Sequence, residues 1–582
     1  MFKSLKDCVG QYKKAALLTP VFTALEVLME VMIPFTTASL IDKGINAGNM
    51  SAVWKYGLIM LVLAFFSLFC GVMSGKYSAE ASTGFAANVR DKMYKKIQTF
   101  SFSNIDTFST AGLVTRLTTD VTNVQNAFMM LIRIAVRPPL MLTMSIVMCL
   151  TISRSLSTVF FVAIVFLGIM IGLLLPRVNK VFTETFNKYD DLNAEVQENV
   201  TGVRVVKAYV REDYEKKKFS VAAHNLRNLF EKAEGMMACV GPIMNLAVYG
   251  CIVSLSWFGA HQIVGGTLTT GQLTSMFSYI MSILMSLMML SMVIVMITMS
   301  VASIRRISEV LNAVPDIQNP ENPVYAVQDG SIDFEHVNFS YALGTGENVL
   351  DDIDLHIHSG ETIGIIGGTG SGKSTFVSLI SRLYDTTQGT VKVGGKDVRE
   401  YDIDSLRNEV SVVLQKNVLF SGTVLDNLRW GDETASEEEC WKACELACAD
   451  EFLKKNPDGL QARVEQGGNN FSGGQKQRLC IARALLKSPK VLILDDSTSA
   501  VDTATDAKIQ GAFQTEIPDT TKIIISQRIS SVKNADRILV IDDGKISGFD
   551  THANLLKTNA IYKEIEEAQN KVGGDFDKSE MD

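Results

Sequence analysis

Six windows of the sequence are long and apolar enough to cross a lipid bilayer as helices, and they constrain the fold more than any other feature. A spanning helix needs roughly 20 mostly apolar residues. The windows lie at about 16–40, 55–77, 129–151, 156–176, 236–260 and 272–299. They predict an all-α membrane domain of six transmembrane helices in the first half of the chain.

The composition of the chain changes after the sixth window. The 582 residues are enough for two to four domains, and 47% of them are hydrophobic. The long apolar runs end before about Ser300, whereas the residues after about Pro320 have the composition of a soluble α/β domain. The predicted fold class is therefore multidomain, a membrane domain followed by an α/β domain. The expected boundaries are 1–310 for the membrane domain, 311–328 for a linker, 329–570 for the α/β domain and 571–582 for a disordered acidic tail.

Two long segments, about 78–128 and 177–235, join the spans and carry many basic side chains. Lys and Arg are enriched in cytoplasmic segments of membrane proteins. These segments, the N-terminus and the α/β domain are therefore expected on the cytoplasmic side of the cytoplasmic (inner) membrane. Their helical pattern predicts spanning helices that extend into the cytosol. Each would turn back through a short helix able to touch the α/β domain, near Gly112 in "FSTAGLVTRL" and near Tyr209 in "KAYVREDYEK".

Two acidic residues, Glu26 and Glu30, lie one helical turn apart in the first span. A charge near the bilayer centre costs roughly 2.5–3.5 kcal/mol on insertion scales, so such acids usually face a bundle interior or a water-filled cavity. One interpretation is a site for a cationic substrate. The other is a helix-packing or gating contact near an aqueous cleft.

The sixth span is rich in methionine, a flexible and polarizable residue that suits surfaces accepting varied apolar ligands. The alternative is ordinary packing or contact with lipid, because the methionines surround the helix rather than form one stripe. The candidates for substrate contact are Met285, Met289 and Met292. The other methionines of this span are Met276, Met281, Met288, Met296 and Met299.

Charge and cysteine content exclude some classes of protein. The net charge of −8 and the lack of a basic stripe argue against nucleic acid as a partner. The nine cysteines show no CxxC pair and read as reduced thiols. Cys440, Cys444 and Cys448 have the spacing of one helix face. They are interpreted as small buried side chains of an amphipathic helix, although three thiolates on one face could also bind a metal.

The segment "GGTGSGKST", from Gly367 to Thr375, has the pattern of a phosphate-binding loop. It follows an apolar strand, "ETIGIIG", and precedes a helical pattern, as such a loop requires. Its glycines let successive backbone N–H groups face phosphates at the positive end of the helix. Lys373 would reach the β- and γ-phosphates of ATP, and Ser374 a magnesium ion. The expected nucleotide contacts are Gly367, Gly368, Thr369, Gly370, Ser371, Gly372, Lys373, Ser374 and Thr375.

The apolar run "VLILDD" ends in two acids, Asp495 and Asp496. Nucleotide hydrolases often end such a strand with a magnesium-holding aspartate, and Asp495 fits that role. The segment between the phosphate-binding loop and this strand has room for a helical subdomain, to which "ASEEECWKACELACADEFL" fits.

A third motif, "FSGGQKQR", resembles the signature motif of ABC transporter ATPase domains. "STSAVD" resembles the family's loop that crosses the dimer interface, "RVEQGG" a contact to the membrane domain through Glu465, and "TAGLVTRLTTDVTNVQ" and "ENVTGVRVVKAY" the cytoplasmic loops of the exporter branch. The resemblance covers nearly the whole chain. It implies an adenine-stacking role for Tyr341, a magnesium- and water-sensing role for Gln415, and further ATP contacts from Ser472, Gly473, Gly474, Gln475 and Asp502.

In the family that the chain resembles, two ATPase domains close head to tail. Each ATP then lies between the phosphate-binding loop of one domain and the signature motif of the other. Ser472, Gly473 and Gly474, at the start of a helix, suit this role because they offer N–H donors to a γ-phosphate. A chain with one membrane domain and one ATPase domain is expected to need a second half transporter.

Two positions depart from the family's usual residues. Its catalytic glutamate falls at Asp496 and its switch histidine at Gln527. Aspartate is shorter by one methylene, and a misplacement on the order of 1 Å can cost about 100-fold in rate. Glutamine can hydrogen-bond a phosphate but cannot carry the charge of an imidazolium. The pair resembles the degenerate-site subunit of heterodimeric ABC exporters, so the expected partner carries an intact glutamate and histidine, and this chain's own site should bind ATP and hydrolyse it slowly.

The resulting hypothesis is one half of a heterodimeric exporter for amphipathic drugs or lipids, with ATP and Mg²⁺ as cofactors and membrane lipid as surroundings. A peptide exporter and a regulatory subunit that gates a channel without transport remain as alternatives. A soluble ABC ATPase is excluded by the six spans, and an importer is disfavoured by the long cytoplasmic helices. The fold alone does not determine the substrate.

Overall fold

The apolar windows of the sequence form long helices in a computed structural model, which describes residues 5–341, 346–497 and 499–576. Within these ranges, six helical stretches are long and apolar enough to cross a membrane. They are Asp7–Ile45, Met50–Gln98, Thr110–Ile152, Arg154–Phe182, Glu212–Val264 and Thr270–Leu290. The predicted fold class, a six-helix membrane domain joined to an α/β domain, is confirmed.

The chain divides into two units. The first comprises Met1–Gln98 and Ser109–Ala313, and the second comprises Thr99–Phe108 and Val314–Asp582. The helices of the first unit are η1 (Asp7–Tyr12), α2 (Lys13–Leu40), η2 (Ile41–Ile45), α3 (Met50–Gln98), α5 (Thr110–Thr115), η3 (Arg116–Asp120), α6 (Val121–Met129), η4 (Met130–Ile134), α7 (Arg137–Ile152), α8 (Arg154–Thr201), α9 (Val203–Ala208), α10 (Glu212–Ala238), α11 (Val240–Val264) and α12 (Thr270–Asn312).

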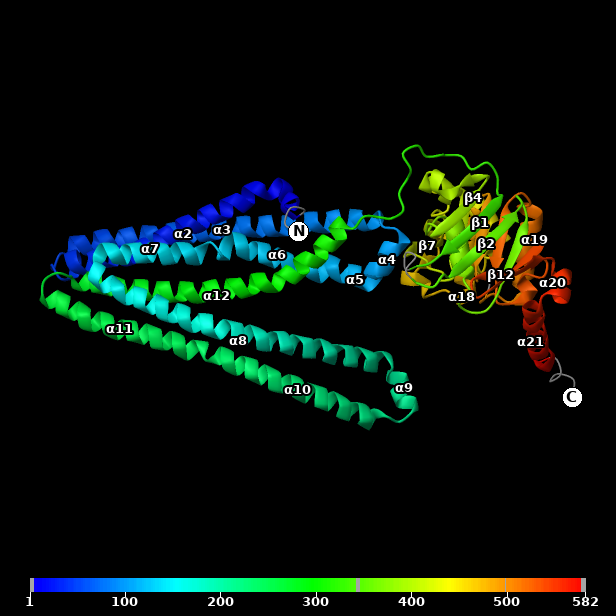
Figure 1. Cartoon of the computed structure of the whole chain (residues 1–582). Helices are drawn as coiled ribbons and strands as arrows, with labels where there is room; N and C mark the ends of the chain where they lie inside the picture. The colour runs from blue at the N-terminus through cyan, green and yellow to red at the C-terminus, as the bar shows by residue number, and fades with distance from the viewer. Residues whose placement is uncertain (1–4, 342–345, 498, 577–582) are drawn as a thin grey trace. The chain divides into compact units, whose positions relative to one another are not determined.

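Helix α12 is the centre of the membrane unit, where it packs against α2 and α7 (Figure 1). Its Tyr279 is fully buried and donates a hydrogen bond to the carbonyl oxygen of Val31 in α2, at 2.8 Å. Aliphatic and aromatic side chains of α2, α7, α8 and α11 complete this apolar core. Dispersion contacts among these closely packed side chains hold the helices together, and the hydrogen bond to Val31 satisfies the buried hydroxyl of Tyr279.

The third predicted span is not a single regular helix. Helix α6 ends at Met129, the π-helical turn η4 follows, and α7 begins at Arg137 with Pro138 in its first turn. Proline is tolerated there because the first turn of a helix has no internal partner for its N–H groups. Single π-turns of this kind are frequent at functional sites.

The two turns of the long cytoplasmic segments differ from each other. Helices α8 and α10 run side by side and are joined by the short α9, next to the predicted turn at Tyr209 (Figure 1). The other turn was predicted near Gly112, but the short helix that belongs to the second unit is α4 (Phe102–Phe108). The predicted turn therefore lies a few residues too late in the chain. The sequence was misleading because "TAGLVT" also forms a short helix, α5, but α5 belongs to the first unit.

The second unit is built on a six-stranded sheet of order β12-β11-β3-β10-β9-β6, in which all neighbours are parallel except β11 and β12. An antiparallel sheet of order β2-β1-β4-β5 and a two-stranded pair, β7 and β8, complete it. The strands are β1 (Ile332–Phe339), β2 (Leu350–Ile357), β3 (Thr362–Ile366), β4 (Gln388–Val393), β5 (Lys396–Asp397), β6 (Val410–Val413), β7 (Gly422–Thr423), β8 (Arg463–Val464), β9 (Val491–Asp495), β10 (Thr521–Ile525), β11 (Arg537–Asp542) and β12 (Lys545–Asp550). The helices are α13 (Lys373–Ile380), η5 (Val398–Glu400), α14 (Ile403–Glu409), α15 (Val424–Leu428), α16 (Glu437–Leu446), α17 (Asp450–Leu453), η6 (Gly459–Gln461), η7 (Gln466–Gly468), α18 (Gly473–Leu485), α19 (Thr503–Glu516), η8 (Ile529–Ser531), α20 (His552–Thr558) and α21 (Ala560–Phe576).

Strands β9 and β10 are buried along their whole length, as expected for the centre of a parallel sheet covered on both faces. Parallel strands present their carboxyl ends at one edge, where ligands bind in open α/β sheets. The ends of β3 and β9, at Ile366 and Asp495, therefore place the phosphate-binding loop and the acidic pair at the same edge.

The three cysteines near α16 are free and buried, and among the described residues no group of three or more His, Cys, Asp or Glu side chains could hold a metal ion. Burial raises the pKa of Cys444 to about 12, so its thiol stays protonated. All three cysteines belong to the buried apolar core of this unit, as the packing interpretation predicts. The helix α21 continues to Phe576, past the start of the tail that was expected to be disordered, and the remaining tail residues 577–582 lie outside the described ranges.

Candidate functional site

The phosphate-binding loop connects β3 to α13, and its glycines are required by its backbone. Gly370 and Gly372 have φ of +83° and +99°, in the left-handed region that favours glycine. A Cβ on Gly367 would lie 2.1 Å from the carbonyl oxygen of Ile541. A Cβ on Gly368 would meet nothing within 4 Å. The loop therefore packs tightly against the sheet at Gly367, whereas at Gly368 there is free space beside its backbone.

Lys373 and Ser374 begin α13 and face the loop and the sheet edge. The Lys373 Nζ donates to the carbonyl oxygens of Gly367 (2.9 Å) and Gly368 (2.6 Å). The Ser374 Oγ donates to Oδ1 of Asp495 at 3.1 Å, across 121 positions of the chain. The sequence predicted that both Ser374 and Asp495 hold magnesium, and the structure brings their oxygens together.

The acidic pair at the end of β9 lies in a poorly solvated corner. Burial raises the pKa of Asp495, and the nearby Asp496 raises it further, while Ser374 and Lys373 act in the opposite direction. Burial also raises the pKa of Asp496. The charged Lys373 is itself disfavoured by burial, which lowers its pKa. A divalent cation would compensate the two carboxylates, and hydroxyl plus carboxylate oxygens are the hard donors that Mg²⁺ prefers.

Asp496 lies between two glutamines. Nε2 of Gln527 donates to its Oδ2 at 3.4 Å, and hydrogen bonding by Gln415 counteracts the rise in its pKa. The backbone of Asp496 is left-handed, with φ of 47°. The three residues that were predicted to handle the attacking water are thus brought together, with Gln527 at the long limit of a hydrogen bond.

Tyr341 is a half-exposed aromatic at the entrance to the site. Its hydroxyl hydrogen-bonds with Oγ1 of Thr375 at 3.0 Å. Its ring packs edge-on against Phe339 and Tyr384, with centroids 4.8 and 5.2 Å apart. With 52% of its surface exposed, the ring is available for stacking, the role that the sequence predicted for it.

Tyr384 links this aromatic group to α4, and sequence reasoning missed it. Its hydroxyl donates to Oδ2 of Asp106 at 2.6 Å, and its ring meets Phe102 edge-on. Burial, and next the bond to Asp106, raise the pKa of Tyr384. The serine hydroxyls of Ser101 and Ser103 add hydrogen bonds to Asp316. No local pattern marks Tyr384, because its partners lie far away in the sequence.

The signature motif forms the exposed start of α18. Ser472 and Gln475 make a reciprocal cap: the Ser472 Oγ accepts from Gln475 N (3.3 Å), and Ser472 N donates to Gln475 Oε1 (2.9 Å). A Cβ on Gly474 would lie 2.7 Å from the carbonyl oxygen of Ala500. The neighbouring loop therefore packs on the start of α18, and glycine at 474 is a steric requirement.

Asp502 is the N-cap of α19, where its Oδ1 accepts from Thr505 N at 2.9 Å. That hydrogen bond, the largest contribution, lowers the pKa of Asp502. Its predicted contact across a dimer interface, and the predicted contact of the exposed Glu465 with a membrane domain, stay predictions. Thr498, in the same loop as Asp502, lies outside the described residues.

In the membrane unit, the acids of the first span are paired with an arginine that sequence reasoning missed. Arg137, at the start of α7, donates from one nitrogen to Glu26 Oε1 (2.8 Å) and from the other to both oxygens of Glu30 (2.7 and 2.8 Å). The methionines predicted to meet substrate are exposed in the single chain. Their exposed fractions are 61% for Met285, 40% for Met289 and 63% for Met292.

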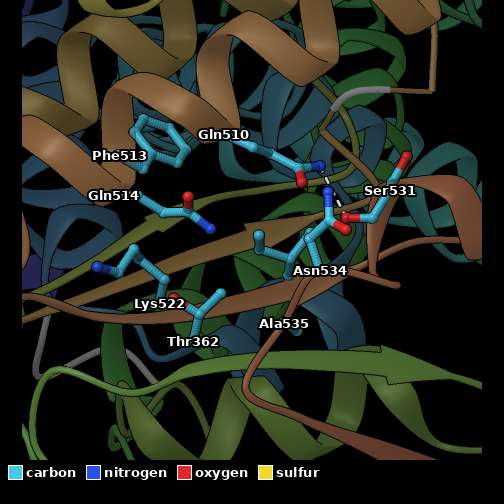
Figure 2. A pocket seen from close by; sticks show the side chains of 9 residues that line it. Thr362, Gln510, Phe513, Gln514, Lys522, Ser531, Asn534 and Ala535 are labelled. Atoms are coloured by element: carbon cyan, nitrogen blue, oxygen red, sulfur yellow. Dashed lines mark hydrogen bonds between the residues drawn. The ribbon is translucent and has the colours of Figure 1, made fainter. Parts of the chain in front are cut away.

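Figure 2 shows a pocket next to α19 that takes no part in this chemistry. Gln510 and Phe513 of α19 line it, and Gln510 Nε2 donates to the carbonyl oxygen of Ser531 at 2.7 Å. Its volume of about 10 Å³ holds no more than one water molecule. We interpret it as a packing gap.

Comparison with known proteins shows the family to which the chain belongs. Residues 17–288 match the family described as the ABC transporter transmembrane region, and residues 350–499 match the ABC transporter family. An uncharacterized ABC transporter ATP-binding protein of Mycobacterium tuberculosis (strain ATCC 25618 / H37Rv) is 35% identical over 98% of this chain and 99% of its own. The chain belongs to the ABC transporters. The ABC transporter ATP-binding protein YfiB of Bacillus subtilis, also uncharacterized, is 35% identical over 94% of both chains.

The fold of this ABC transporter chain has a solved counterpart. The structure of a bacterial Atm1-family ABC exporter with ATP bound superposes with a TM-score of 0.82, covers 96% of this chain and 99% of its own, and is 22% identical. The chain is thus an integral membrane protein with one transmembrane region and one ATP-hydrolysing domain, the composition of a half transporter.

Proposed function

We propose that this ABC transporter chain is one half of a heterodimeric exporter of amphipathic drugs or lipids in the cytoplasmic membrane, with its ATPase domain in the cytoplasm. Its own site binds ATP and hydrolyses it slowly, and its signature motif completes the active site of a partner chain that carries an intact glutamate and histidine. The observation that carries the proposal is the pair Asp496 and Gln527 at the hydrolytic corner.

Several side chains of this chain fit ATP and Mg²⁺. Bound Mg²⁺ would supply charge neutralisation to the phosphates. Ser374 and Asp495 would hold the ion, since their oxygens already meet at 3.1 Å. Lys373 would turn from the loop carbonyls toward the phosphates, and Tyr341 would stack on the adenine. Each of these groups would bind or orient ATP or Mg²⁺. None of these roles requires a glutamate at position 496.

Asp496 and Gln527 lie together at the hydrolytic corner, but both are weak replacements for the residues that activate water. A general base must lie within hydrogen-bonding reach of the water from which it takes a proton. Asp496 reaches one methylene less far than a glutamate, and Gln527 already binds it at 3.4 Å. Gln527 stays neutral, so it cannot place a positive charge beside a transferring phosphoryl group. Both substitutions weaken the same step and leave binding intact.

Unlike the hydrolytic corner, the signature motif of this chain keeps the residues that are expected to contact ATP. The cap between Ser472 and Gln475 fixes the first turn of α18, and Ser472 and Gly473 are exposed there. The start of a helix favours an anion through its unpaired N–H groups and its dipole. These groups are suited to a γ-phosphate held by another chain.

The test is steady-state ATPase activity of the chain alone and of its heterodimer with the partner. The chain alone is expected to turn over little ATP, and co-expression with the partner is expected to restore turnover. Robust activity of the chain alone, abolished by Lys373→Ala, would contradict the proposal.

Two variants of the heterodimer test which site is active. Gly474→Asp places an anion where the partner's γ-phosphate approaches and also meets Ala500, so it should lower turnover roughly 100- to 1000-fold. Asp496→Asn should lower turnover only modestly. Gly511→Asp is the matched control, since a Cβ there meets nothing within 4 Å. If Asp496→Asn is the more damaging change, the two sites have been assigned the wrong way round.

A further inference from the structure

An open cavity of about 540 Å³ lies in the membrane unit, between α2, α3 and η4. It is lined by Glu26, Glu30, Ser67, Leu68, Gly71, Val72, Gly75, Lys76 and Arg133. Charged side chains inside a membrane domain are costly and usually mark a substrate or ion pathway. The cavity is therefore a candidate ligand-binding site, and the residues that line it indicate the chemistry of the ligand.

The two acids of the cavity are already neutralised by the protein. Arg137 binds Glu26 and Glu30 at 2.7–2.8 Å, through both of its terminal nitrogens. The side chains of Glu26 and Glu30 are only 13% and 27% exposed. A cationic ligand would have to displace an arginine that already donates charge-assisted hydrogen bonds to both carboxylates.

Two further cations line the cavity without such compensation. Among the described residues, neither Lys76 nor Arg133 has an ion-pair or hydrogen-bonding partner. With Arg137 included, three positive side chains face two negative ones, so the cavity carries a net charge of +1. An anion, and not a cation, would be attracted to it.

The backbone of α3 lets these groups come close. A Cβ on Gly75 would lie 3.5 Å from a terminal nitrogen of Arg133, and a Cβ on Gly71 would lie 3.2 Å from Glu26 Oε1. Arg133 belongs to the π-turn η4, which interrupts the third span at this point. Leu68 and Val72, 63% and 57% exposed, continue the same lining with apolar surface.

We infer that this cavity binds an amphipathic anion, with its acidic headgroup between Lys76 and Arg133 and its apolar part along Leu68 and Val72. The inference rests on the proposed transport function and names the substrate class. A phosphate or carboxylate headgroup suits the planar donor fork of Arg133. The headgroup can come from a membrane phospholipid or from a soluble amphipathic acid, since both present the same chemistry to the two cations.

Native mass spectrometry of the full chain in dodecyl maltoside tests this inference without ATP or partner. The chain is titrated separately with decyl phosphate, phosphatidylglycerol and decyltrimethylammonium. At least one of the two anions should bind more tightly than the cation. Lys76→Gln with Arg133→Gln should weaken anion binding roughly tenfold to 100-fold, because two charged hydrogen bonds are lost. Lys13→Gln with Lys55→Gln, which removes two charges from α2 and α3 outside the cavity, should leave it unchanged.

The outcomes separate the alternatives. Binding of phosphatidylglycerol alone identifies a lipid headgroup, and binding of decyl phosphate alone identifies a soluble acid; both support the inference. Glu26→Gln with Glu30→Gln should keep anion binding, because it frees Arg137. The inference is overturned if decyltrimethylammonium binds as tightly as the anions and loses affinity in that variant, or if the Lys76 and Arg133 variant binds the anions as wild type does. Because no nucleotide is present, this result is independent of the ATPase test of the heterodimer.

Discussion

Each of the two units carries a pair of acidic side chains that are at least partly buried, and the two pairs are balanced differently. In the membrane unit, Glu26 and Glu30 share the guanidinium of Arg137. In the ATPase unit, Asp495 and Asp496 keep raised pKa values, and burial is the largest cause for both. The first pair has its counter-ion within the protein, and the second pair lacks full compensation.

The difference shows how to distinguish a structural acid from an acid that awaits a ligand. An acidic pair that a neighbouring basic side chain neutralises contributes to helix packing. The sign of any net charge that remains around it determines whether an anion or a cation is attracted. A pair left partly uncompensated in a desolvated corner is suited to an incoming cation. By this criterion the sequence interpretation of Glu26 and Glu30 as a packing contact is favoured over the interpretation as a cation site.

Among the tests of this comparison, the largest expected effect comes from removing the acid that is proposed to hold the ion. Asp495→Asn should lower the affinity of the chain for ATP in the presence of Mg²⁺ by roughly tenfold to 100-fold, since a charged ligand of the ion is lost. In EDTA the variant should bind ATP no less tightly than wild type. Equilibrium titration of a fluorescent ATP analogue measures both, with Asp496→Asn as the control that keeps the Mg²⁺ effect. An equal loss in both conditions would show that Asp495 acts on folding instead.

A smaller effect is expected from breaking the balance in the membrane unit. Arg137→Gln leaves two partly buried carboxylates without a counter-ion and should lower the free energy of unfolding by about 2 kcal/mol, less than for a fully buried pair because Arg137 is 36% exposed. Thermal unfolding of the purified chain measures it.

The matched control for Arg137→Gln removes all three charges together. The triple variant Glu26→Gln, Glu30→Gln and Arg137→Gln should recover most of the lost stability, since no uncompensated charge remains. A triple variant as unstable as the single one would mean that Arg137 acts through packing of its side chain and not through its charge.

The smallest effect is the pH dependence of the ATPase unit without nucleotide. A carboxyl whose folded pKa is raised binds more protons in the folded than in the unfolded state, so stability falls as pH rises from the ordinary value of 3.8 through the raised value. Asp495→Asn with Asp496→Asn should make this fall shallower. Unfolding midpoints of the full chain across this pH range test it, and an unchanged slope would assign the fall to other groups.

The sequence predicted the features that depend on local spacing. The phosphate-binding loop is recognisable because its glycines, Lys373 and Ser374 lie within nine consecutive residues, and the spans because each is one apolar run. The sequence did not predict the pairing of Arg137 with Glu26, which are 111 positions apart, or of Tyr384 with Asp106, which are 278 apart. Such contacts depend on how helices and strands pack, which a periodic pattern does not specify. For the same reason, the turn was predicted near Gly112, whereas the short helix of the second unit is α4, a few residues earlier in the chain.

The left-handed backbone of Asp496 has a consequence for evolution and for engineering. Among residues other than glycine, aspartate and asparagine are the ones that tolerate this conformation best, because their short polar side chains can bond locally. A longer acid at position 496 would extend farther toward a water molecule but would fit the backbone less well. Replacing Asp496 with glutamate would therefore trade folded stability for reach toward such a water molecule, an exchange of stability for function that is common in enzymes. Under selection for stability alone, position 496 would keep the shorter acid.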